Sequence, residues 1–457
     1  MRETEKQKLI AFFDERDEDG LTNREKIAAR AKVIRRVATT DKNRSFEQAE
    51  TPESSGEWPL GVVEENGKLI GLGIHIHNED IYPIQSFEIY LRDCGLTGTL
   101  DLTSCRDLIF TDLYRNRLSA VRLGDNPALR ILGVQDNRLE TLDPTGLPAC
   151  QGIDAGKNRL ERIDVSQNAE LVELYLNDNR FTEIDLRSNP LLRYFYCHRN
   201  RLTELDTTAN PLLRHLNATE NPLRRIRCLA PQRETPLPLE LTAGEGGCVG
   251  LRFQPVYNAQ WKETGEWEQS YFAYPDTGFR FLGWFDGAGE KLSGKTQWKD
   301  EYGAGRVLTA RFEKVRIVPF EEQYRDDLIF MVLEAKDALG RVPRLNPDLL
   351  DIRGAYFDKG DFFWVALDGN GRVIGSVGYN CIPGTEEVRL HRLYVKASCK
   401  RQGIGSALLD TAERHIRAQG KTAVSVHLGG KEYVESRCFY PKHGYGFDGE
   451  DLVRKSL

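Results

Sequence analysis

The sequence lacks any apolar run that approaches the ~20 residues needed to span a membrane. Its first six residues are charged or polar apart from Met1, so they lack the apolar core of a signal peptide. It also lacks an excess of positive charge, because its formal net charge is −6 at pH 7. We therefore expect neither a membrane partner nor a nucleic acid held by bulk positive charge.

Paired cysteines are absent as well. The nine cysteines are scattered, odd in number and never spaced as Cys-x-x-Cys. This pattern argues against a disulfide framework and against a zinc site, so we expect no bound metal. Reduced thiols are typical of the cytoplasm, and we expect a cytoplasmic protein.

A ladder of asparagines is the clearest regularity that is present. One asparagine recurs every 21 residues, at Asn116, Asn137, Asn158, Asn179, Asn200 and Asn221. Apolar residues recur two and five positions after each asparagine, as a stacked core requires. This pattern resembles the leucine-rich repeat family over about residues 58–230, with an N-terminal cap over 58–93. The resemblance implies a curved array whose concave face carries a parallel sheet and usually binds partners.

Tyrosine and histidine recur at the expected solvent-facing strand positions of these repeats. The candidate partner-binding residues are Tyr175, Tyr194, Tyr196, His198 and His215. Such side chains offer contact area and hydrogen bonds together, which suits a protein or peptide partner. The alternative is that they merely cover the sheet.

A different pattern begins near residue 231. Three short strand-like runs with glycine-rich turns lie between residues 239 and 315. One of them follows the pattern Gly-x-x-Phe-x-Gly-Trp over residues 278–284. This order resembles the internalin-type B-repeat, which implies a small β-grasp-like module with a spacing role.

The segment 400–409 follows a strand-like run over 389–395 and opens a helical pattern. A strand, a glycine-containing turn and a helix N-terminus form a layout that holds an anion, because free N–H groups and the helix dipole point outward. Gly403 and Gly405 let the backbone approach a phosphate closely, and Lys400 and Arg401 add positive charge. The segment contains neither a dinucleotide-binding nor a Walker fingerprint.

Two motifs together resemble the GNAT acetyltransferase superfamily across about residues 316–457. The first is Lys400 to Gly405 after a Leu-Tyr-Val strand, and the second is Phe439 to Tyr445. The resemblance implies acetyl-CoA as donor and an amine as acceptor. It places the pyrophosphate near Lys400 and Arg401, on the backbone of Gln402, Gly403, Ile404, Gly405 and Ser406. It places the pantetheine arm along Leu393, Tyr394 and Val395.

The resemblance also implies direct acyl transfer without a covalent enzyme intermediate. Tyr440 corresponds to the tyrosine that protonates the departing CoA thiolate. The general base stays open, because Arg389 stands where many relatives carry a glutamate and Tyr433 where an asparagine often follows the next strand. His391 and Glu387 are the nearest candidates, beside a water-relayed or absent base.

At 457 residues the chain is long enough for about three domains. We predict a multidomain α/β protein with a helical arm and flexible linker (1–57), a repeat solenoid (58–230), a β module (231–315) and a GNAT-type domain (316–457). The predicted function is acetyl transfer from acetyl-CoA to an amine, with the repeats recruiting a protein or peptide. The alternative is an interaction scaffold that carries an independent small-amine or weakly active acetyltransferase domain.

Overall fold

The structure, a computed structural model, describes residues 3–27, 63–65, 68–73, 87–103, 105–231, 236–260, 262–299, 306–340, 342–429 and 434–457. The chain divides into two compact units. The first comprises Met1–Thr242, Val249–Phe272 and Gln297–Leu308; the second comprises Ala243–Cys248, Ala273–Thr296 and Thr309–Leu457. The segment 231–315 therefore contributes to both units. Most of the predicted linker lies outside the described residues, and within them no helix is long and apolar enough to cross a bilayer.

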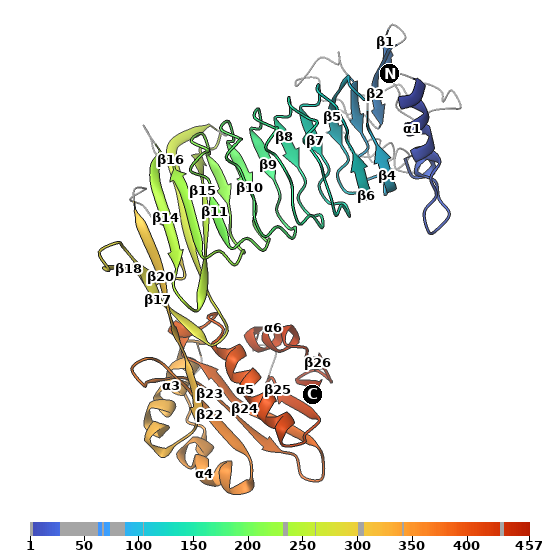
Figure 1. Cartoon of the computed structure of the whole chain (residues 1–457). Helices are drawn as coiled ribbons and strands as arrows, with labels where there is room; N and C mark the ends of the chain where they lie inside the picture. Colours follow the sequence, from blue (N-terminus) through green and yellow to red (C-terminus); the bar gives the residue numbers. More distant parts are fainter. Residues whose placement is uncertain are drawn as a thin grey trace. The chain divides into compact units, whose positions relative to one another are not determined.

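The first unit is a stack of short parallel strands that recur once per 21 residues (Figure 1). Phe195 pairs with Leu174 on one side and with Leu216 on the other, and all three side chains are fully buried. The repeat predicted from the asparagine ladder is thus confirmed as a β-solenoid stretch. Its parallel strands are β2 (Lys68–Gly73), β3 (Phe87–Tyr90), β5 (Leu108–Asp112), β7 (Ile131–Gly133), β8 (Gly152–Asp154), β9 (Glu173–Tyr175), β10 (Tyr194–Tyr196) and β12 (His215–Asn217).

The ladder asparagines are buried, with 3–9% of their surface exposed. Asn158 shows the role that each has: its Oδ1 accepts from Leu139 N at 3.0 Å, and its Nδ2 donates to Val134 O at 3.0 Å. The residue before each ladder asparagine is left-handed, with φ between 52° and 58°. Each side chain therefore satisfies backbone groups that the sharp turn leaves without a strand partner.

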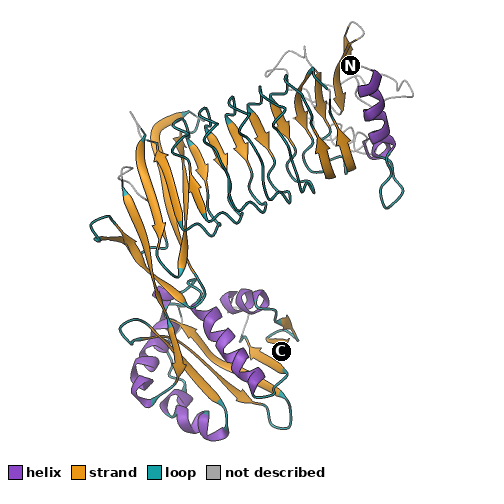
Figure 2. Ribbon diagram, in the orientation of Figure 1, coloured by secondary structure: helices purple, strands orange, loops and turns teal. Residues whose placement is uncertain are grey.

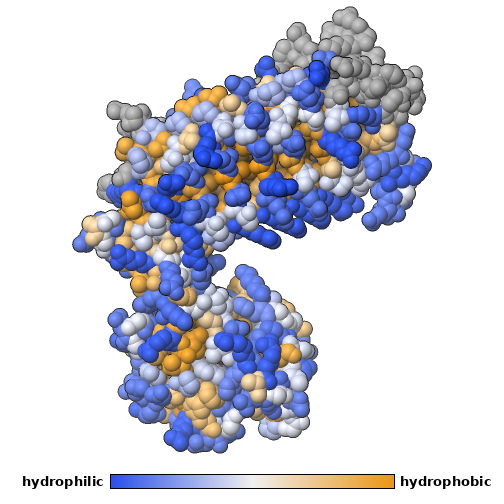
Figure 3. All heavy atoms as spheres, viewed as in Figure 1, coloured by the Kyte–Doolittle hydropathy of each residue, from blue (hydrophilic) through white to orange (hydrophobic). Residues whose placement is uncertain are grey.

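The other elements of the first unit lie at the ends and edges of this stack. Helix α1 has Leu9, Phe12 and Phe13 buried. In the space-filling view, apolar residues form an orange band along the stack, with hydrophilic residues on both sides (Figure 3). The remaining elements are α1 (Glu3–Asp14), β1 (Val63–Glu65), β4 (Thr97–Asp101), β6 (Arg117–Arg122), β11 (Glu204–Asp206), β13 (Arg225–Ala230), β14 (Leu237–Ala243), β15 (Gly247–Tyr257), β16 (Glu263–Pro275) and β19 (Gln297–Lys299).

The second unit is built on a seven-stranded mixed sheet with helices on both faces (Figure 2). One core lies between the sheet and α5, and the other lies between the sheet and α3 with the short helices that follow it. The sheet order is β21 (Arg316–Pro319), β22 (Phe362–Leu367), β23 (Val373–Cys381), β24 (Glu387–Val395), β25 (Ala423–His427), β27 (Leu452–Ser456) and β26 (Gly446–Phe447). The helices are α3 (Arg325–Asp337), α4 (Ile352–Ala355), α5 (Ile404–Ala418) and α6 (Val434–Lys442), with 3₁₀ turns η1 (Glu322–Tyr324), η2 (Pro347–Leu350), η3 (Phe357–Lys359) and η4 (Ala397–Cys399).

A small antiparallel group lies mostly in the second unit. β17 (Phe279–Phe285) pairs with β18 (Lys291–Ser293) on one side and with β20 (Val307–Lys314) on the other. Trp284 is fully buried, and its indole N–H donates to Lys295 O at 3.1 Å. Trp284 is therefore a core residue of this group.

Replacement of a ladder asparagine tests the solenoid. Asn158→Ala leaves Leu139 N without its side-chain acceptor, whereas Val134 O keeps the hydrogen bond from Asn137 Nδ2 at 3.0 Å. Since a buried unpaired group costs about 1–3 kcal/mol, we expect the free energy of unfolding to fall by about that amount in urea denaturation. The exposed neighbour Arg159→Ala is the control and should change it by less than about 0.5 kcal/mol. An equal loss in both variants would contradict the role given to the ladder.

Candidate active site

Strands β24 and β25 run side by side over only three residue pairs. Their parallel register runs from Glu387 opposite Ala423 to Arg389 opposite Ser425. β24 continues to Val395 without a further β25 partner, and a cleft of about 790 Å³ opens beside it. The divergence of two parallel strands therefore creates the cavity in the second unit.

A bulge redirects β24 where it borders the cleft. Ser376 pairs with Tyr394 and Gly378 with His391, so β24 carries one more residue than β23 in this interval. Arg392, inside the bulge, has a φ of 56°, and Ser376 Oγ donates to its carbonyl oxygen at 2.8 Å. A bulge of this kind increases local twist and changes the direction of neighbouring side chains.

An ion pair holds the bulge from the other side. Arg392 Nη2 lies 2.7 Å from Asp348 Oδ1, and the hydroxyl of Tyr356 donates to Asp348 Oδ2 at 2.7 Å. Burial alone would raise the pKa of Asp348, but the hydrogen bonds from Arg392 and Tyr356 outweigh it and keep the pKa below its ordinary value. The carboxylate stays charged, and Arg392 is fixed by a residue 44 positions earlier in the chain.

The N-terminus of α5 forms the second wall of the cleft. Gly403 precedes the helix with a φ of 77°, and no side chain caps the helix at this position. Arg401 also has a left-handed φ of 61°. Lys400, Arg401 and Ser406 line the cleft beside the first turn of the helix. Uncapped N–H groups, a positive helix end and cationic side chains together suit an anion.

The cleft brings most of the predicted site residues together. It is lined by His391, Leu393, Tyr394, Val395, Lys400, Arg401, Gly403, Gly405, Ser406 and Tyr440. Gln402 and Ile404 are not among the lining residues. The Gln402 side chain accepts from Phe281 N at 2.9 Å, and Ile404 is 1% exposed in the core under α5. These two residues can therefore contact the donor only through their backbone atoms.

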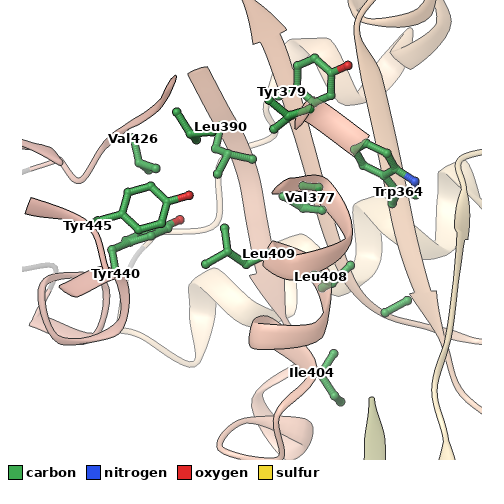
Figure 4. Close-up of a cluster of buried hydrophobic side chains, with 14 of the residues drawn as sticks. Trp364, Val377, Tyr379, Leu390, Ile404, Leu408, Leu409, Val426, Tyr440 and Tyr445 are labelled. Atoms are coloured by element: carbon green, nitrogen blue, oxygen red, sulfur yellow. The ribbon is translucent and has the colours of Figure 1, made fainter. Parts of the chain in front are cut away.

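Tyr440 reaches the cleft from α6 and is 5% exposed. Figure 4 shows its ring beside that of Tyr445, close to Val426 and Leu409. Burial, followed by the neighbouring Tyr394, raises the pKa of Tyr440 above its ordinary value. The phenol therefore stays protonated at neutral pH and is available as a proton donor.

A buried carboxylate stabilises the side of the cleft that Tyr440 forms. Tyr445, whose ring centroid lies 5.4 Å from that of Tyr440, donates its hydroxyl to Glu413 Oε1 at 2.9 Å. Lys455 Nζ lies 2.7 Å from the other oxygen of Glu413. Glu413 was not predicted from the sequence, although a charged residue on the apolar side of the α5 pattern is a signal for it.

The two candidate bases differ in position. His391 lines the cleft, whereas Glu387 lies at the start of β24, where its carboxylate ion-pairs with Arg454 at 2.7 Å. The structure does not bring Glu387 to the cleft, because the paired part of β24 separates them. Burial lowers the pKa of His391, and the charge of Arg392 lowers it further, although Asp348 acts in the opposite direction. A neutral imidazole can accept a proton.

Polar residues that sequence analysis did not single out also border the anion-binding end. Glu435 lines the cleft and holds Lys400 at 2.7 Å. His443 Nε2 lies 3.1 Å from the hydroxyl of Ser406. These contacts join residues 35 and 37 positions apart in the sequence, so they cannot be deduced from local sequence.

The predicted partner-binding residues of the first unit also gather in the structure. The rings of Tyr194 and His215 stack with centroids 4.3 Å apart, and Tyr175 meets Tyr196 edge-on at 5.2 Å. His198 packs against Tyr196 at 6.4 Å. Consecutive strands β9, β10 and β12 thus present one continuous aromatic patch.

Comparisons with known proteins find similarity within the second unit. Residues 359–446 match the family model of the acetyltransferase (GNAT) domain. N-acetyltransferase 8 of Rattus norvegicus is 37% identical over 114 residues, which are 24% of this chain and 50% of that protein. N-acetyltransferase 8 of Mus musculus is 32% identical over 114 residues, which are 24% of this chain and 49% of that protein. The chain thus spans about half the length of these curated relatives.

Two solved structures are also similar to the chain. An acetyltransferase of the GNAT family from Staphylococcus aureus has 18% identity and a TM-score of 0.29, and covers 31% of this chain and 99% of its own. The PaiA N-acetyltransferase from Thermoplasma acidophilum, in complex with coenzyme A, has 21% identity and a TM-score of 0.26, and covers 32% of this chain and 100% of its own. The family match confirms the predicted GNAT domain in the C-terminal part of the chain.

The protonation of His391 can be measured directly. Because burial and the Arg392 charge disfavour the imidazolium, we expect the pKa of His391 to lie below its ordinary value of 6.5. The ring is charged below that pKa and neutral above it, so the basic form should persist somewhat below pH 6.5. An NMR titration of the histidine ring signals measures this, with His391→Gln to assign the resonance. A midpoint at or above 6.5 would contradict the expectation.

Proposed function

We propose that this protein is an N-acetyltransferase that transfers an acetyl group from acetyl-CoA to an amine acceptor. One observation supports it above all others. The cleft beside β24 joins an uncapped helix N-terminus, a strand end and the protonated phenol of Tyr440. Direct acyl transfer needs these three elements: a place for an anionic donor, an oxyanion-stabilising backbone and a proton source.

The anion-binding end of the cleft fits the pyrophosphate of the donor. Among the described residues, no carboxylate lies within ion-pair distance of Arg401, so its charge is available to a ligand. The backbone around Gly403 and Gly405 gives close access, and Ser406 adds a hydroxyl. Acetyl-CoA bound there supplies the activated acetyl group.

Residues of this chain then accept and donate the protons of the reaction. His391, held neutral by burial, accepts a proton from the attacking amine. A backbone N–H of β24 beyond Arg389 stabilises the oxyanion, because this part of the strand has no partner in β25. Tyr440 gives its proton to the departing thiolate.

Removal of the phenolic hydroxyl tests this assignment. Tyr440→Phe keeps the ring in its buried position but removes the proton donor, so we expect kcat to fall about 10²-fold. Calorimetry should give a Kd for acetyl-CoA within about threefold of wild type, because the change is less than about 1 kcal/mol. Tyr379→Phe, which removes another hydroxyl from the same core, is the control and should leave kcat near wild type. Unchanged turnover in Tyr440→Phe would remove Tyr440 from the mechanism.

We further propose that the first unit is a leucine-rich repeat array that binds a protein or peptide through its aromatic patch, and that the segment 231–315 is an internalin B-repeat-like spacer. The patch comprises Tyr175, Tyr194, Tyr196, His198 and His215; the first four rings are half-buried and His215 is buried, which suits an amphipathic partner. The scattered free thiols are consistent with a cytoplasmic location. The acidic net charge is consistent with a partner that is not a nucleic acid.

The second candidate is a protein-interaction scaffold whose acetyltransferase domain acts on a small amine independently of the repeats, or acts weakly. Arg389 supports this second candidate, because a cation occupies the strand position where many related enzymes carry a glutamate as general base. In this candidate the partner of the repeats is not the acetyl acceptor.

Loss of one ring from the patch tests partner binding. Tyr196→Ala removes the contacts with both Tyr175 and His198, so full-length protein should lose partners that wild type retains from lysate in a quantitative pull-down. Arg187→Ala, whose side chain is 84% exposed, is the control and should retain them. An identical set of proteins on all three baits would contradict a binding role for the patch.

A further inference from the structure

The outer face of β24 carries three charged or titratable side chains in a row. Val388 and Leu390 point into the core and are 0% and 2% exposed, so the alternating residues Glu387, Arg389 and His391 share the opposite face. The bulge comes only after His391, and the alternation therefore holds over this interval. Arg389 and His391 are neighbours on one face, with a rise of roughly 7 Å between them.

Arg389 differs from the other arginines of this part of the sheet. Its Nε donates to the hydroxyl of Ser425 at 3.3 Å, and it is partly buried. Arg392 is neutralised by Asp348 and Arg454 by Glu387, each at 2.7 Å. In the part of the chain that the structure describes, no carboxylate lies within ion-pair distance of Arg389.

A partly buried guanidinium without a counter-ion is unfavourable, and deprotonation does not relieve the cost, because arginine stays charged at any working pH. The planar fork of N–H donors matches a carboxylate in geometry and in charge. A dianionic phosphate group would demand more cations than this one arginine supplies. The local chemistry therefore favours a single carboxylate as the missing partner.

The position of Arg389 shows which ligand brings that carboxylate. It occupies the last register position that β24 shares with β25, and the cleft lining begins with the next residue of the strand, Leu390. Its charge also acts on the imidazole of His391, lowering the pKa of that ring. The anion-binding end of the cleft, at Arg401, lies on the helical wall instead. Arg389 thus lies at the edge of the cleft, two residues before His391 on the strand side, and not at the helical, anion-binding end.

We propose that Arg389 binds a carboxylate of the acceptor, and that the acceptor is a small amine with a carboxylate next to the reacting nitrogen, as in an α-amino acid. The inference rests on the proposed acetyltransferase function and deepens it. The N–C bond to the acetyl group forms as the thioester C–S bond breaks. The amine proton goes to His391, and Tyr440 protonates the sulfur. The products are an N-acetyl amino acid and CoA thiol, and no oxidant or reductant is needed.

The test compares the twenty amino acids with their carboxamides as acceptors for the full-length protein. Each pair has the same amine and side chain, and only the carboxylate is lost. Neutralising the carboxylate also lowers the pKa of the amine and increases its reactive neutral fraction, so this bias works against the prediction. We expect kcat/KM to favour the accepted amino acids over their amides by about 10–100-fold, as for loss of a charge-assisted hydrogen bond.

Two variants and a control test whether Arg389 causes the preference for the acid over the amide. Arg389→Gln should reduce the acid-over-amide ratio to within about threefold of one, while Arg389→Lys, which keeps the charge but not the fork, should give an intermediate ratio. Arg414→Gln removes an exposed cation from α5 and should leave the ratio unchanged. Thermal melting of each variant shows that the fold is retained, and the KM for acetyl-CoA should stay within about twofold.

Three results would overturn the inference. Wild type could use amides as well as acids; Arg389→Gln could keep the preference; or no amino acid could be acetylated although calorimetry shows acetyl-CoA binding. These results leave the donor site intact. Failure to bind acetyl-CoA at all would instead refute the proposed function, and the inference with it.

Discussion

Parallel strands β24 and β25 keep a common register over only three pairs, and the chemistry of the second unit depends on what happens where that register stops. Beyond Arg389 the two strands diverge, and the bulge at Arg392 turns β24 away from a regular ladder. A continuous sheet here would fill its own hydrogen bonds and leave no cavity. The divergence gives backbone and side chains a shared space of about 790 Å³.

Charge is distributed unequally around that space. Two of the basic residues that line the cleft are paired, Lys400 with Glu435 and Arg392 with Asp348. Among the described residues, no carboxylate lies within ion-pair distance of Arg401 or Lys442 in the lining, or of Arg389 at its edge. Since paired charges are screened by their partners, the unpaired ones select anionic ligands. Anionic groups at two separate places therefore suit this unit, as the proposed donor and the proposed acceptor would supply.

The sequence predicted the local parts of this arrangement better than the distant ones. The asparagine ladder predicted a repeating strand stack, and the segment 400–405 predicted a helix N-terminus, because both signals lie within a few residues of the structure that they form. The Arg392–Asp348 pair, the Tyr445–Glu413 hydrogen bond and the Ser406–His443 contact join residues 32 to 44 positions apart. A periodic pattern within a short stretch of sequence does not reveal such contacts. Glu387 looked equal to His391 in sequence, but in the structure His391 lines the cleft and Glu387 pairs with Arg454 outside it.

The chemistry of the acceptor also constrains the role of the repeats. A lysine side chain of a protein has no carboxylate beside its amine, whereas Arg389 requires one there if it is to be neutralised by the acceptor. A small acceptor of this kind reaches the cleft by diffusion and needs no docking surface. With the proposed amino-acid acceptor, the aromatic patch of Tyr194, Tyr196 and His215 would serve a partner other than the acceptor. Under this arrangement, loss of the patch changes which partners the enzyme retains and leaves its rate on amino acids unaltered, while loss of the Arg389 charge does the reverse.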